Sequence, residues 1–467
     1  MSKQVRTQTI TTPAVDRTPP IIQDFQWQPS RVVNGKVYDA VVSFTVEDDD
    51  SGIADTRAIL QEYVGSLPAG SYPEEAQRTL QLAPPLPTVE RTVRFSGQVG
   101  DLKGGKRYRI SMTAKDSAGN AAEVSRDTPY VREFENAASD DDFLVGAHYY
   151  AWFTHDNWRM PFPYGFAHYG NPLLGEYASS DPFVISKHVD WATGHGIDFF
   201  MMSWWGPGGP IEYAIENVFT NPRINDGKLV VTYESAGRLN TEINEFGWIT
   251  RIDVNNPHNR KILSNDIDYL CDKFLGRERY LRIEGSPVIF LYSSRFYSGD
   301  VSTVLRDLRQ SLRDKYGMEI FILGDEMYWG IDPDASSIEK RLKLFDGVTC
   351  YSMHTSVKDI IYRDFEKKVD KVFKDWAKAC ARLGVRFVPN AFPGYDDRRL
   401  RVPSPNLPFE RSIDGFRRRL ETALKYLDEG RMLTITSFNE WGEYTCIEPS
   451  QEYGFDYLNI LRDSLTG

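Results

Sequence analysis

The sequence predicts an α/β fold: a (β/α)₈ TIM barrel preceded by an all-β sandwich. Two observations predict the barrel. After residue 143 short apolar runs alternate with longer amphipathic segments, and eight such runs occur. A third observation predicts the sandwich, because before residue 135 apolar and polar residues alternate as they do in half-buried antiparallel strands. With 467 residues, the chain is long enough for two or three domains.

The N-terminal region begins with a polar, Thr-rich stretch, and we expect residues 1–15 to form a flexible tail. The period-two pattern covers residues 16–135. The segment 42–46, for example, places Val, Phe and Val at alternate positions, and Gly- and Asp-rich turns separate such segments. These short strands predict a β-sandwich over 16–135, followed by a polar linker at 136–142.

The stretch 114–120, Ala-Lys-Asp-Ser-Ala-Gly-Asn, resembles the end of bacterial immunoglobulin-like or fibronectin-like modules. Such modules usually space or position a neighbouring domain, so the resemblance implies a spacer role, with direct glycan binding as the alternative. It also favours an extracellular or cell-surface location. The residues after Met1 nevertheless lack the apolar core of a signal peptide.

An acidic turn at Glu47-Asp48-Asp49-Asp50 could hold Ca²⁺. However, Ile59 stands where an EF-hand loop counted from Asp48 would need its twelfth-position Glu. We therefore expect a solvated acidic loop here.

The apolar runs of the barrel have the length of buried strands, and amphipathic segments lie between them. One such segment follows Ser180-Asp181-Pro182, an N-cap residue with a proline, and its apolar positions 185, 189 and 192 share one helix face. A doubly wound sheet is the alternative, but no glycine-rich phosphate turn follows the first run. The expected strands are 143–151, 197–205, 228–234, 286–293, 319–325, 347–352, 386–392 and 431–438.

Aromatic and acidic residues recur where these strands end. Because barrel active sites form at the carboxyl ends of the strands, we expect these side chains to surround one site. Aromatic rings bind the apolar faces of sugars, and carboxylates and amides bind the hydroxyls, so the pattern predicts a carbohydrate site. The candidate substrate-binding residues are Tyr149, Tyr150, Trp152, Trp204, Trp205, Glu234, Tyr351, His354, Tyr395, Asn439 and Trp441.

Two acids, Glu440 and Glu443, follow the eighth expected strand with a tryptophan between them. For an isolated pair of this kind, a salt bridge or cap on a solvated turn would be the ordinary interpretation. Their place at a strand exit, among aromatic residues, favours acid/base chemistry on a sugar instead. We predict that Glu440 and Glu443 are catalytic.

Other functions find less support in the composition. The net charge of −11 argues against nucleic acid or an anionic membrane as partner, and no run of 18 apolar residues predicts a membrane span. The histidines show no HExxH or Cys/His ligand spacing, and no GxSxG elbow occurs, so we expect no metal and no cofactor. We expect the four distant cysteines to be mostly buried free thiols: Cys271, Cys350, Cys380 and Cys446.

Three motifs, 149–152 (Tyr-Tyr-Ala-Trp), 203–206 (Ser-Trp-Trp-Gly) and 439–443 (Asn-Glu-Trp-Gly-Glu), resemble glycoside hydrolase family 99 and its wider relatives. That group includes endo-α-mannosidases and proteins found with polysaccharide-biosynthesis genes. The segment 447–458 is similar to the group's closing helix, so the resemblance spans about 143–467. It implies a (β/α)₈ barrel that hydrolyses α-mannosides with retention.

The resemblance also implies roles for individual residues. Retention in this family is thought to use the sugar's own 2-hydroxyl, which Glu440 would deprotonate. Glu443 would protonate the leaving oxygen and then activate water. Glu234 would bind substrate, and Tyr149, Tyr150 and Trp205 would contact the sugar at the cleavage point.

The sequence departs from the family at Gly442, where endo-mannosidases commonly carry His. We expect this change to remove a polar contact and to open space beside Glu443. Two alternatives stay open: a polysaccharide-biosynthesis protein of the same barrel type that transfers glycosyl groups, and a non-catalytic glycan-binding protein. Sugar identity, linkage, endo or exo mode and oligomeric state do not follow from these residues.

Overall fold

A computed structural model of the chain describes residues 16–33, 36–49, 51–63, 72–73, 76–84, 90–137, 143–221, 224, 227–245, 247–354 and 364–466. The chain divides into two compact units, 1–135 and 136–467. The tail expected at 1–15 and most of the linker expected at 136–142 lie outside the described residues.

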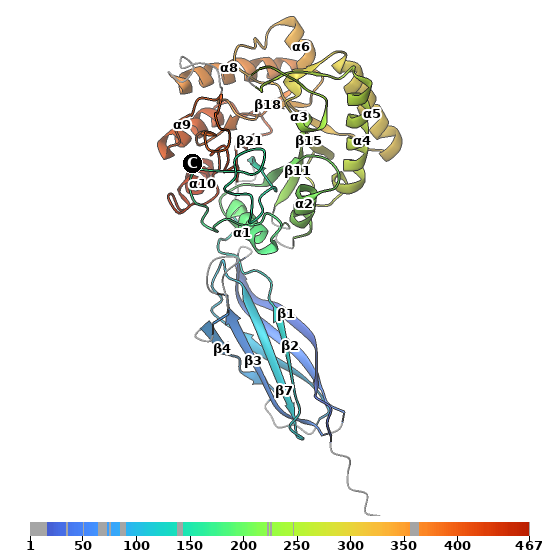
Figure 1. Ribbon diagram of the computed structural model, residues 1–467, viewed down its shortest axis with the longest axis vertical. Coiled ribbons are helices and arrows are strands. Elements are labelled where there is room, and N and C mark those ends of the chain that lie inside the picture. The colour runs from blue at the N-terminus through green and yellow to red at the C-terminus, as the bar shows by residue number, and fades with distance from the viewer. Residues whose placement is uncertain are drawn as a thin grey trace, which may run out of the picture. The chain divides into compact units, whose positions relative to one another are not determined.

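The N-terminal unit contains two four-stranded antiparallel sheets (Figure 1). One sheet has the order β1 (Ile21–Val33), β2 (Lys36–Glu47), β6 (Thr92–Val99) and β5 (Leu82–Ala83). The other has the order β4 (Gln77–Thr79), β3 (Ile53–Glu62), β7 (Tyr108–Asp116) and β8 (Ala121–Asp127).

Alternate residues of both sheets of this unit enter one apolar core. Phe44 and Phe95 come from the first sheet, and Leu60 and Ile110 come from the second. Period-two patterning therefore produced strands that are buried on one face, as expected. The immunoglobulin-like or fibronectin-like character of the unit stays a prediction.

The second unit is TIM-barrel-like. Its parallel strands are β9 (Leu144–Tyr149), β10 (Phe199–Trp204), β11 (Lys228–Glu234), β15 (Ser286–Tyr292), β17 (Phe321–Asp325), β18 (Gly347–Thr349), the pair β19 (Arg386–Phe387) and β20 (Asn390–Ala391), and β21 (Met432–Ile435). Each begins and ends within one of the eight expected runs, so the strand prediction is confirmed.

The strand order shows how the sheet curls. It runs β19-β18-β17-β15-β11-β10-β9-β21-β20, so β9, the first barrel strand of the chain, pairs with β21, the last. The two ends, β19 and β20, are separated by only Val388 and Pro389 and belong to one short chain segment. A sheet whose two edges lie on the same segment must curl back on itself, as a barrel does.

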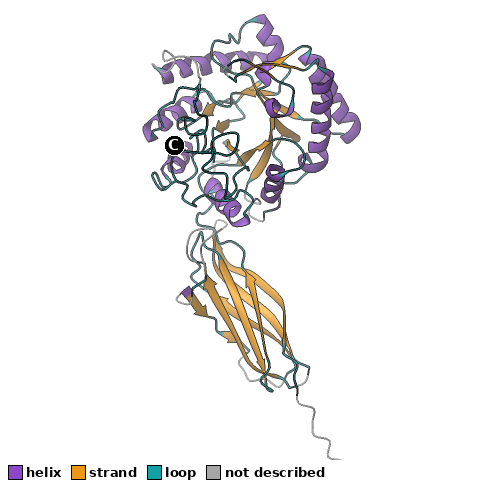
Figure 2. Cartoon of the chain, in the orientation of Figure 1, coloured by secondary structure: helices purple, strands orange, loops and turns teal. Residues whose placement is uncertain are grey.

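Helices lie outside the ring of strands (Figure 2). They are α1 (Pro182–Thr193), α2 (Pro210–Thr220), α4 (Pro257–Leu270), α5 (Val301–Tyr316), α6 (Ser336–Leu342), α8 (Phe365–Leu383), α9 (Ile413–Leu424) and α10 (Asp456–Thr466). The short helix α3 (Ser235–Arg238) directly follows β11. As predicted, Asp181 caps α1, since its side chain accepts a hydrogen bond from the Phe183 N–H ahead of a helix that starts with proline.

Short additional strands and turns lie in the loops of this unit: β12 (Glu242–Ile243), β13 (Ile249–Asp253), β14 (Arg282–Ile283), β16 (Tyr297–Ser298), a π-helical turn at Cys271–Leu275 and a 3₁₀ turn at Ser294–Phe296. Inside the barrel, apolar side chains such as Met201, Val230 and Phe290 form a packed core. Gly146 on β9 is required by this packing, because a Cβ there would lie 2.2 Å from the ring of Phe199.

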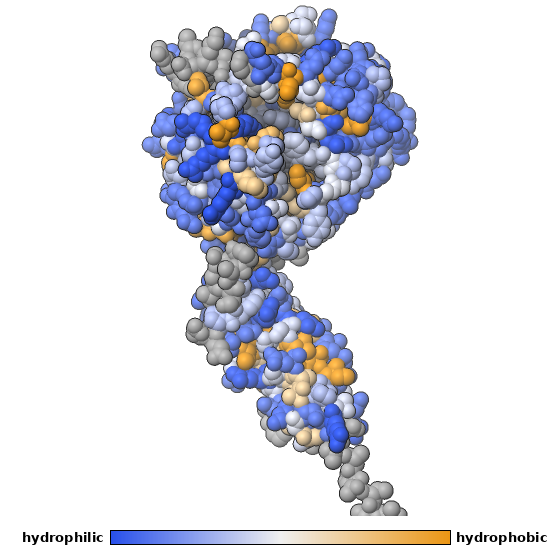
Figure 3. All heavy atoms as spheres, viewed as in Figure 1, coloured by the Kyte–Doolittle hydropathy of each residue, from blue (hydrophilic) through white to orange (hydrophobic). Residues whose placement is uncertain are grey.

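Two further predictions can be checked against the structure. All four cysteines are buried and free, as expected. Among the described residues, no helix is long and apolar enough to cross a membrane. The barrel face shown in Figure 3 is hollowed near its centre, and mostly hydrophilic residues surround the hollow.

Candidate active site

The two predicted catalytic acids lie in the turn that follows β21. The Glu440 side chain is 2% exposed, and its Oε1 accepts hydrogen bonds from the backbone N–H of Gly442 (3.0 Å) and of Glu443 (3.3 Å). The Glu440 N–H donates to Ser437 Oγ at 2.8 Å. These bonds close the turn and hold both carboxyl groups at the same strand exit.

Glu443 has a different partner on each of its carboxyl oxygens. Arg401 Nη2 donates to Oε1 at 3.1 Å, and the Tyr351 hydroxyl donates to Oε2 at 3.4 Å. The Tyr150 hydroxyl in turn donates to the Tyr351 oxygen at 2.8 Å. Residues that follow β9, β18 and β21 therefore meet at one carboxylate, as the barrel rule predicts.

Burial and mutual repulsion govern the ionisation of this acid pair, Glu440 and Glu443. Burial raises the pKa of Glu440 well above its ordinary value, and the neighbouring charge of Glu443 adds to the rise. Burial also raises the pKa of Glu443, but the Arg401 guanidinium opposes that rise. Two carboxyl groups in such a site share protons, so one can act as acid while the other acts as base.

Glu234, at the end of β11, is a third buried acid near this pair. Its Oε1 accepts a hydrogen bond from Ser203 Oγ at 2.6 Å, and Trp205 Nε1 donates to the same Ser203 oxygen at 2.9 Å. Burial raises the pKa of Glu234 to about 8, and the charges of Glu443 and Asp325 contribute to the rise. Glu234 is therefore largely protonated at neutral pH and can donate a hydrogen bond.

Aromatic rings form two groups at the strand exits. The Tyr150 and Trp152 rings lie 4.4 Å apart, and Trp152 in turn stacks on Phe166, with ring centroids 4.6 Å apart. Trp205 is 41% exposed, and its ring centroid lies 6.3 Å from that of Trp152. His354 and Tyr395 stack on each other with centroids 3.7 Å apart. Burial lowers the pKa of His354 to about 3, so its imidazole is neutral.

Three predicted substrate-binding residues have their side chains in the protein core instead. The Tyr149 hydroxyl bonds to His188 Nδ1 at 2.9 Å, and Trp204 Nε1 donates to Glu212 at 3.3 Å. Trp441 Nε1 donates to Glu448 at 2.7 Å. The polar atom of each of the three side chains is thus bonded to a core residue, and the site proposed below does not include them.

Asn439 acts on the backbone. Its Oδ1 accepts from the Tyr150 N–H at 2.7 Å, and its Nδ2 donates to the Tyr150 carbonyl at 2.9 Å. Both peptide groups of Tyr150 are therefore held by the residue that precedes Glu440, which fixes the distance between the first and eighth strand exits. Asn439 therefore positions Tyr150, and both its side-chain oxygen and its side-chain nitrogen are hydrogen-bonded.

The sequence analysis did not identify Arg401, Ser203, Phe166 or Tyr292 as site residues. Burial raises the pKa of Tyr292, and the charges of Glu234, Asp325 and Glu443 add to this rise, which indicates that its ring is close to the acids. Arg401 belongs to the run Arg398-Arg399-Leu400-Arg401, which by itself looks like a solvated charge cluster. No local signal in that run distinguishes the one arginine that reaches an acid.

Gly442 does not open space beside Glu443, and that expectation is wrong. A Cβ at Gly442 would lie 3.1 and 3.2 Å from the two methyl carbons of Leu400, and 3.0 Å from Glu440 Oε1. Leu400 is buried and occupies the space that a side chain at 442 would need. The loop after β20 thus packs directly on the acid pair.

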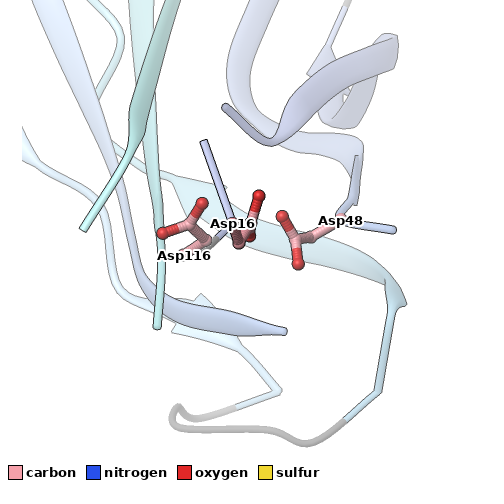
Figure 4. A group of neighbouring side chains, drawn as sticks. All are labelled: Asp16, Asp48 and Asp116. Carbon is pink, nitrogen blue, oxygen red and sulfur yellow. The ribbon is translucent and has the colours of Figure 1, made fainter. Parts of the chain in front are cut away.

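The N-terminal unit contains the group of possible metal ligands that the described residues bring together: Asp16, Asp48 and Asp116 (Figure 4). Their carboxylate oxygens lie within 4.8 Å of one another, and such oxygens are ligands that Ca²⁺ accepts. Asp48 is 4% exposed and its Oδ1 accepts from the N–H groups of Ser51 and Gly52, so the expectation of a solvated loop is wrong at this residue. These turn hydrogen bonds account for the position of Asp48 without an ion.

Comparisons with known proteins show which family and which fold the chain resembles. A family model described as glycosyl hydrolase family 99 matches residues 163–460. A glycoprotein endo-alpha-1,2-mannosidase-like protein of Danio rerio is 25% identical over 385 residues, which cover 71% of this chain and 77% of that protein. The glycoprotein endo-alpha-1,2-mannosidase of Rattus norvegicus is 22% identical over 290 residues, which cover 59% of this chain but only 56% of the rat protein.

A solved structure shares the fold. The GH99 endo-alpha-mannosidase from Bacteroides thetaiotaomicron superimposes with a TM-score of 0.52 at 18% identity, covering 70% of this chain and 97% of that one. At this identity the likeness shows the barrel fold alone.

Proposed function

The chain belongs to glycosyl hydrolase family 99 and is a glycoside hydrolase. From this premise we propose that it cleaves an α-mannosidic linkage of a glycan or polysaccharide with retention, using Glu440 and Glu443. One observation carries the proposal: a buried carboxyl group, Glu440, and a partly buried one, Glu443, share one strand exit, next to a third acid and an exposed tryptophan. Relatives named endo-alpha-1,2-mannosidases support mannose as the sugar.

In the proposed first step, the Glu440 carboxylate takes the proton of the sugar's 2-hydroxyl while that oxygen attacks the anomeric carbon. Glu443 gives its proton to the leaving glycosidic oxygen as the old bond breaks. In the second step, water attacks the anomeric carbon and the bond from that carbon to the 2-oxygen breaks, while Glu443 accepts the water proton and the 2-oxygen regains a proton from Glu440. Two displacements at one carbon give net retention.

The surrounding residues suit this chemistry. Glu234, held protonated by burial, can donate a hydrogen bond to a sugar hydroxyl or ring oxygen. Trp205 is 41% exposed and offers an apolar face for a sugar ring. Tyr351 and Arg401 each bond to one oxygen of Glu443 and so hold its carboxyl group in one orientation for proton transfer.

For the N-terminal unit we propose an immunoglobulin-like spacer in an enzyme that works outside the cell or at the cell surface. Its two sheets share one core, as such modules require. The barrel unit alone should then hydrolyse a soluble oligosaccharide as fast as the full chain. A large rate difference on the soluble substrate would contradict a pure spacer role.

Glu440→Gln and Glu443→Gln test the main proposal on a panel of α-mannosides, with NMR identification of the first-formed anomer. Each change should reduce turnover by about 10³-fold or more without a change in Tm. The matched control is Glu452→Gln, an exposed acid of the same segment that bonds to Asn171. Near-wild-type hydrolysis by both variants, or a product of inverted configuration, would contradict the proposal, and tight glycan binding without hydrolysis by the wild type would favour a binding protein.

A further inference from the structure

The segment 399–401 lies against the acid pair through two adjacent residues. The Leu400 side chain packs on Gly442, and Arg401 bonds to Glu443. Phe162 donates its N–H to the Leu400 carbonyl at 2.9 Å, which ties the segment to the loop after β9. The position of Leu400 therefore determines the backbone position of the next residue, Arg401. Leu400 can lie there only because residue 442 is a glycine.

Arg401 is held in position from its other side by Asp397, which is buried. Arg401 Nη1 donates to Asp397 Oδ2 at 2.8 Å, and the Arg401 N–H donates to the Asp397 carbonyl at 2.8 Å. Asp397 also accepts from Ser404 Oγ (2.5 Å) and from Asn406 Nδ2 (2.7 Å). The Arg401 guanidinium therefore bonds to the carboxylates of Asp397 and Glu443 through two different nitrogens, whereas a lysine would offer a single nitrogen.

Several ionisable groups face Glu443, and they differ in charge. Around the carboxylate are acids, phenols and one cation: Glu440, Glu234, Asp397, Tyr150, Tyr292, Tyr351, Tyr395 and Arg401. Of these, Arg401 alone carries a positive charge, and it is in hydrogen-bond contact with Glu443 and not with Glu440. The pair is therefore electrostatically unequal.

We propose that Arg401 is a positioning residue that makes Glu443 the ionised member of the acid pair in the substrate-free enzyme, leaving the shared proton on Glu440, and that the bare Gly442 permits this by admitting Leu400. The inference rests on the proposed function only for its meaning in catalysis. In the proposed mechanism Glu443 must carry the proton when it acts. A substrate that draws Arg401 off Glu443 then allows the O–H bond at Glu440 to break and one at Glu443 to form, with no change in net charge.

Gly442 makes the proposal testable from a second direction. Its φ lies outside the left-handed region, so the backbone tolerates other residues and only packing opposes them. Gly442→Ala requires Leu400 to yield by a few tenths of an ångström, whereas Gly442→His must displace Leu400 and, with it, Arg401. Leu400→Ala in the Gly442→Ala background should restore the Arg401–Glu443 contact by making room.

Carboxyl titration by ¹³C NMR of full-length protein labelled at Glu Cδ measures the effect without any substrate. The signals are assigned by their loss in Glu440→Gln and Glu443→Gln. In wild type, Glu443 should titrate at lower pH than Glu440, and Arg401→Gln should raise the Glu443 midpoint by about one pH unit or more. Arg399→Gln is the matched control, since Arg399 lies two residues away and bonds to the His168 carbonyl, so its removal should leave both midpoints unchanged.

An unchanged Glu443 midpoint in folded Arg401→Gln, or an equal shift in Arg399→Gln, would overturn the proposal. Should Arg401→Gln fail to fold, Arg401→Lys decides, because a lysine cannot hold Asp397 and Glu443 together and the Glu443 midpoint must still rise. On a cleaved substrate, Arg401→Gln and Gly442→His should both move the optimum of kcat/KM to higher pH. A wild type that cleaves nothing but shows the NMR shift would refute the proposed function and leave this inference standing.

Discussion

A single buried acid, Glu448, and the acid pair Glu440 and Glu443 follow β21 within a few residues of each other, and their carboxyl groups have different kinds of partner. Glu448 accepts from the Tyr177 hydroxyl (2.7 Å) and from Trp441 Nε1 (2.7 Å), and His188 Nε2 lies 3.1 Å from its other oxygen. These partners are a tyrosine, a tryptophan and a histidine, and none of them is an acid. Glu440 and Glu443, in contrast, lie close enough to repel each other, and Arg401 forms an ion pair with Glu443 but not with Glu440.

This difference separates structural acids from reactive ones. A buried carboxylate whose oxygens are all occupied by rigid donors has no free oxygen for a substrate, and its removal leaves those donors unpaired. A buried pair with too few donors holds a proton that can be exchanged. Burial alone would not distinguish them, since Glu448 and Glu440 are both almost completely enclosed.

The largest expected effect is a crossover between Glu443→Gln and Glu448→Gln. Glu443→Gln should lower turnover by about 10³-fold while Tm stays within about 2 °C of wild type. Glu448→Gln should lower the free energy of unfolding by about 3 kcal/mol, yet retain activity within about tenfold at 15 °C. Urea unfolding and initial rates measured on the same samples check both outcomes, and the comparison fails if the two variants behave alike.

Glu234→Gln sharpens the comparison through pH. The folded-state pKa of about 8 exceeds the ordinary 4.5, so the folded protein keeps a proton that the unfolded chain releases, and wild-type stability falls as pH rises from about 5 to 8. The variant has no such loss. Relative to wild type it should gain at most about 4 kcal/mol between pH 5 and pH 8, measured by urea unfolding. Parallel stability curves for the two proteins would show that burial does not raise this pKa.

Trp441→Phe tests whether that ring serves the fold or the substrate. Loss of the indole N–H removes one of the two donors to Glu448 Oε2 and leaves the Tyr177 hydroxyl as the other, which should cost about 1 kcal/mol of unfolding free energy. KM for the glycan should stay within about twofold, because the ring is fully buried. A large rise in KM without a loss of stability would contradict this prediction and would indicate that Trp441 binds substrate.

Ser203→Ala should give the smallest effect. Ser203 joins Glu234 to the Trp205 indole, and its hydrogen bond lowers the pKa of Glu234 against the effect of burial. Removing one hydrogen bond of this kind costs about 1 kcal/mol, or roughly fivefold in KM, with kcat little changed. An unchanged KM would mean that Trp205 does not depend on Ser203 for its orientation.

The sequence predicted which strands exist but not which way their last residues point. Tyr149 and Tyr150 are adjacent at the end of β9, and Trp204 lies between Ser203 and Trp205 at the end of β10. Successive side chains on a strand point to opposite faces, so Tyr150 and Ser203 face the site while Tyr149 and Trp204 face the helices. Both faces of a barrel strand are buried, and an all-apolar run therefore gives no sign of which residues face inward.

Arg401 and Leu400 show a second limit. Their contacts with Glu443 and Gly442 join segments about 40 residues apart in sequence, through a loop with no regular structure. Residue types and spacing indicate neither the path of such a loop nor which of several arginines will reach an acid. The same holds for Phe166, which reaches Trp152 from the long loop after β9.

The sequence by itself determined the eight strands, the sandwich-like alternation before them, and the acid pair at the last strand exit, because these depend on local periodicity and on one rule about where barrel sites form. Only the tertiary structure decided which aromatic residues face the acids, that Leu400 fills the space beside Gly442, and that Arg401 pairs with Glu443. Those outcomes follow from packing and charge between distant segments, whose free energies depend on the whole fold and not on any one stretch of chain.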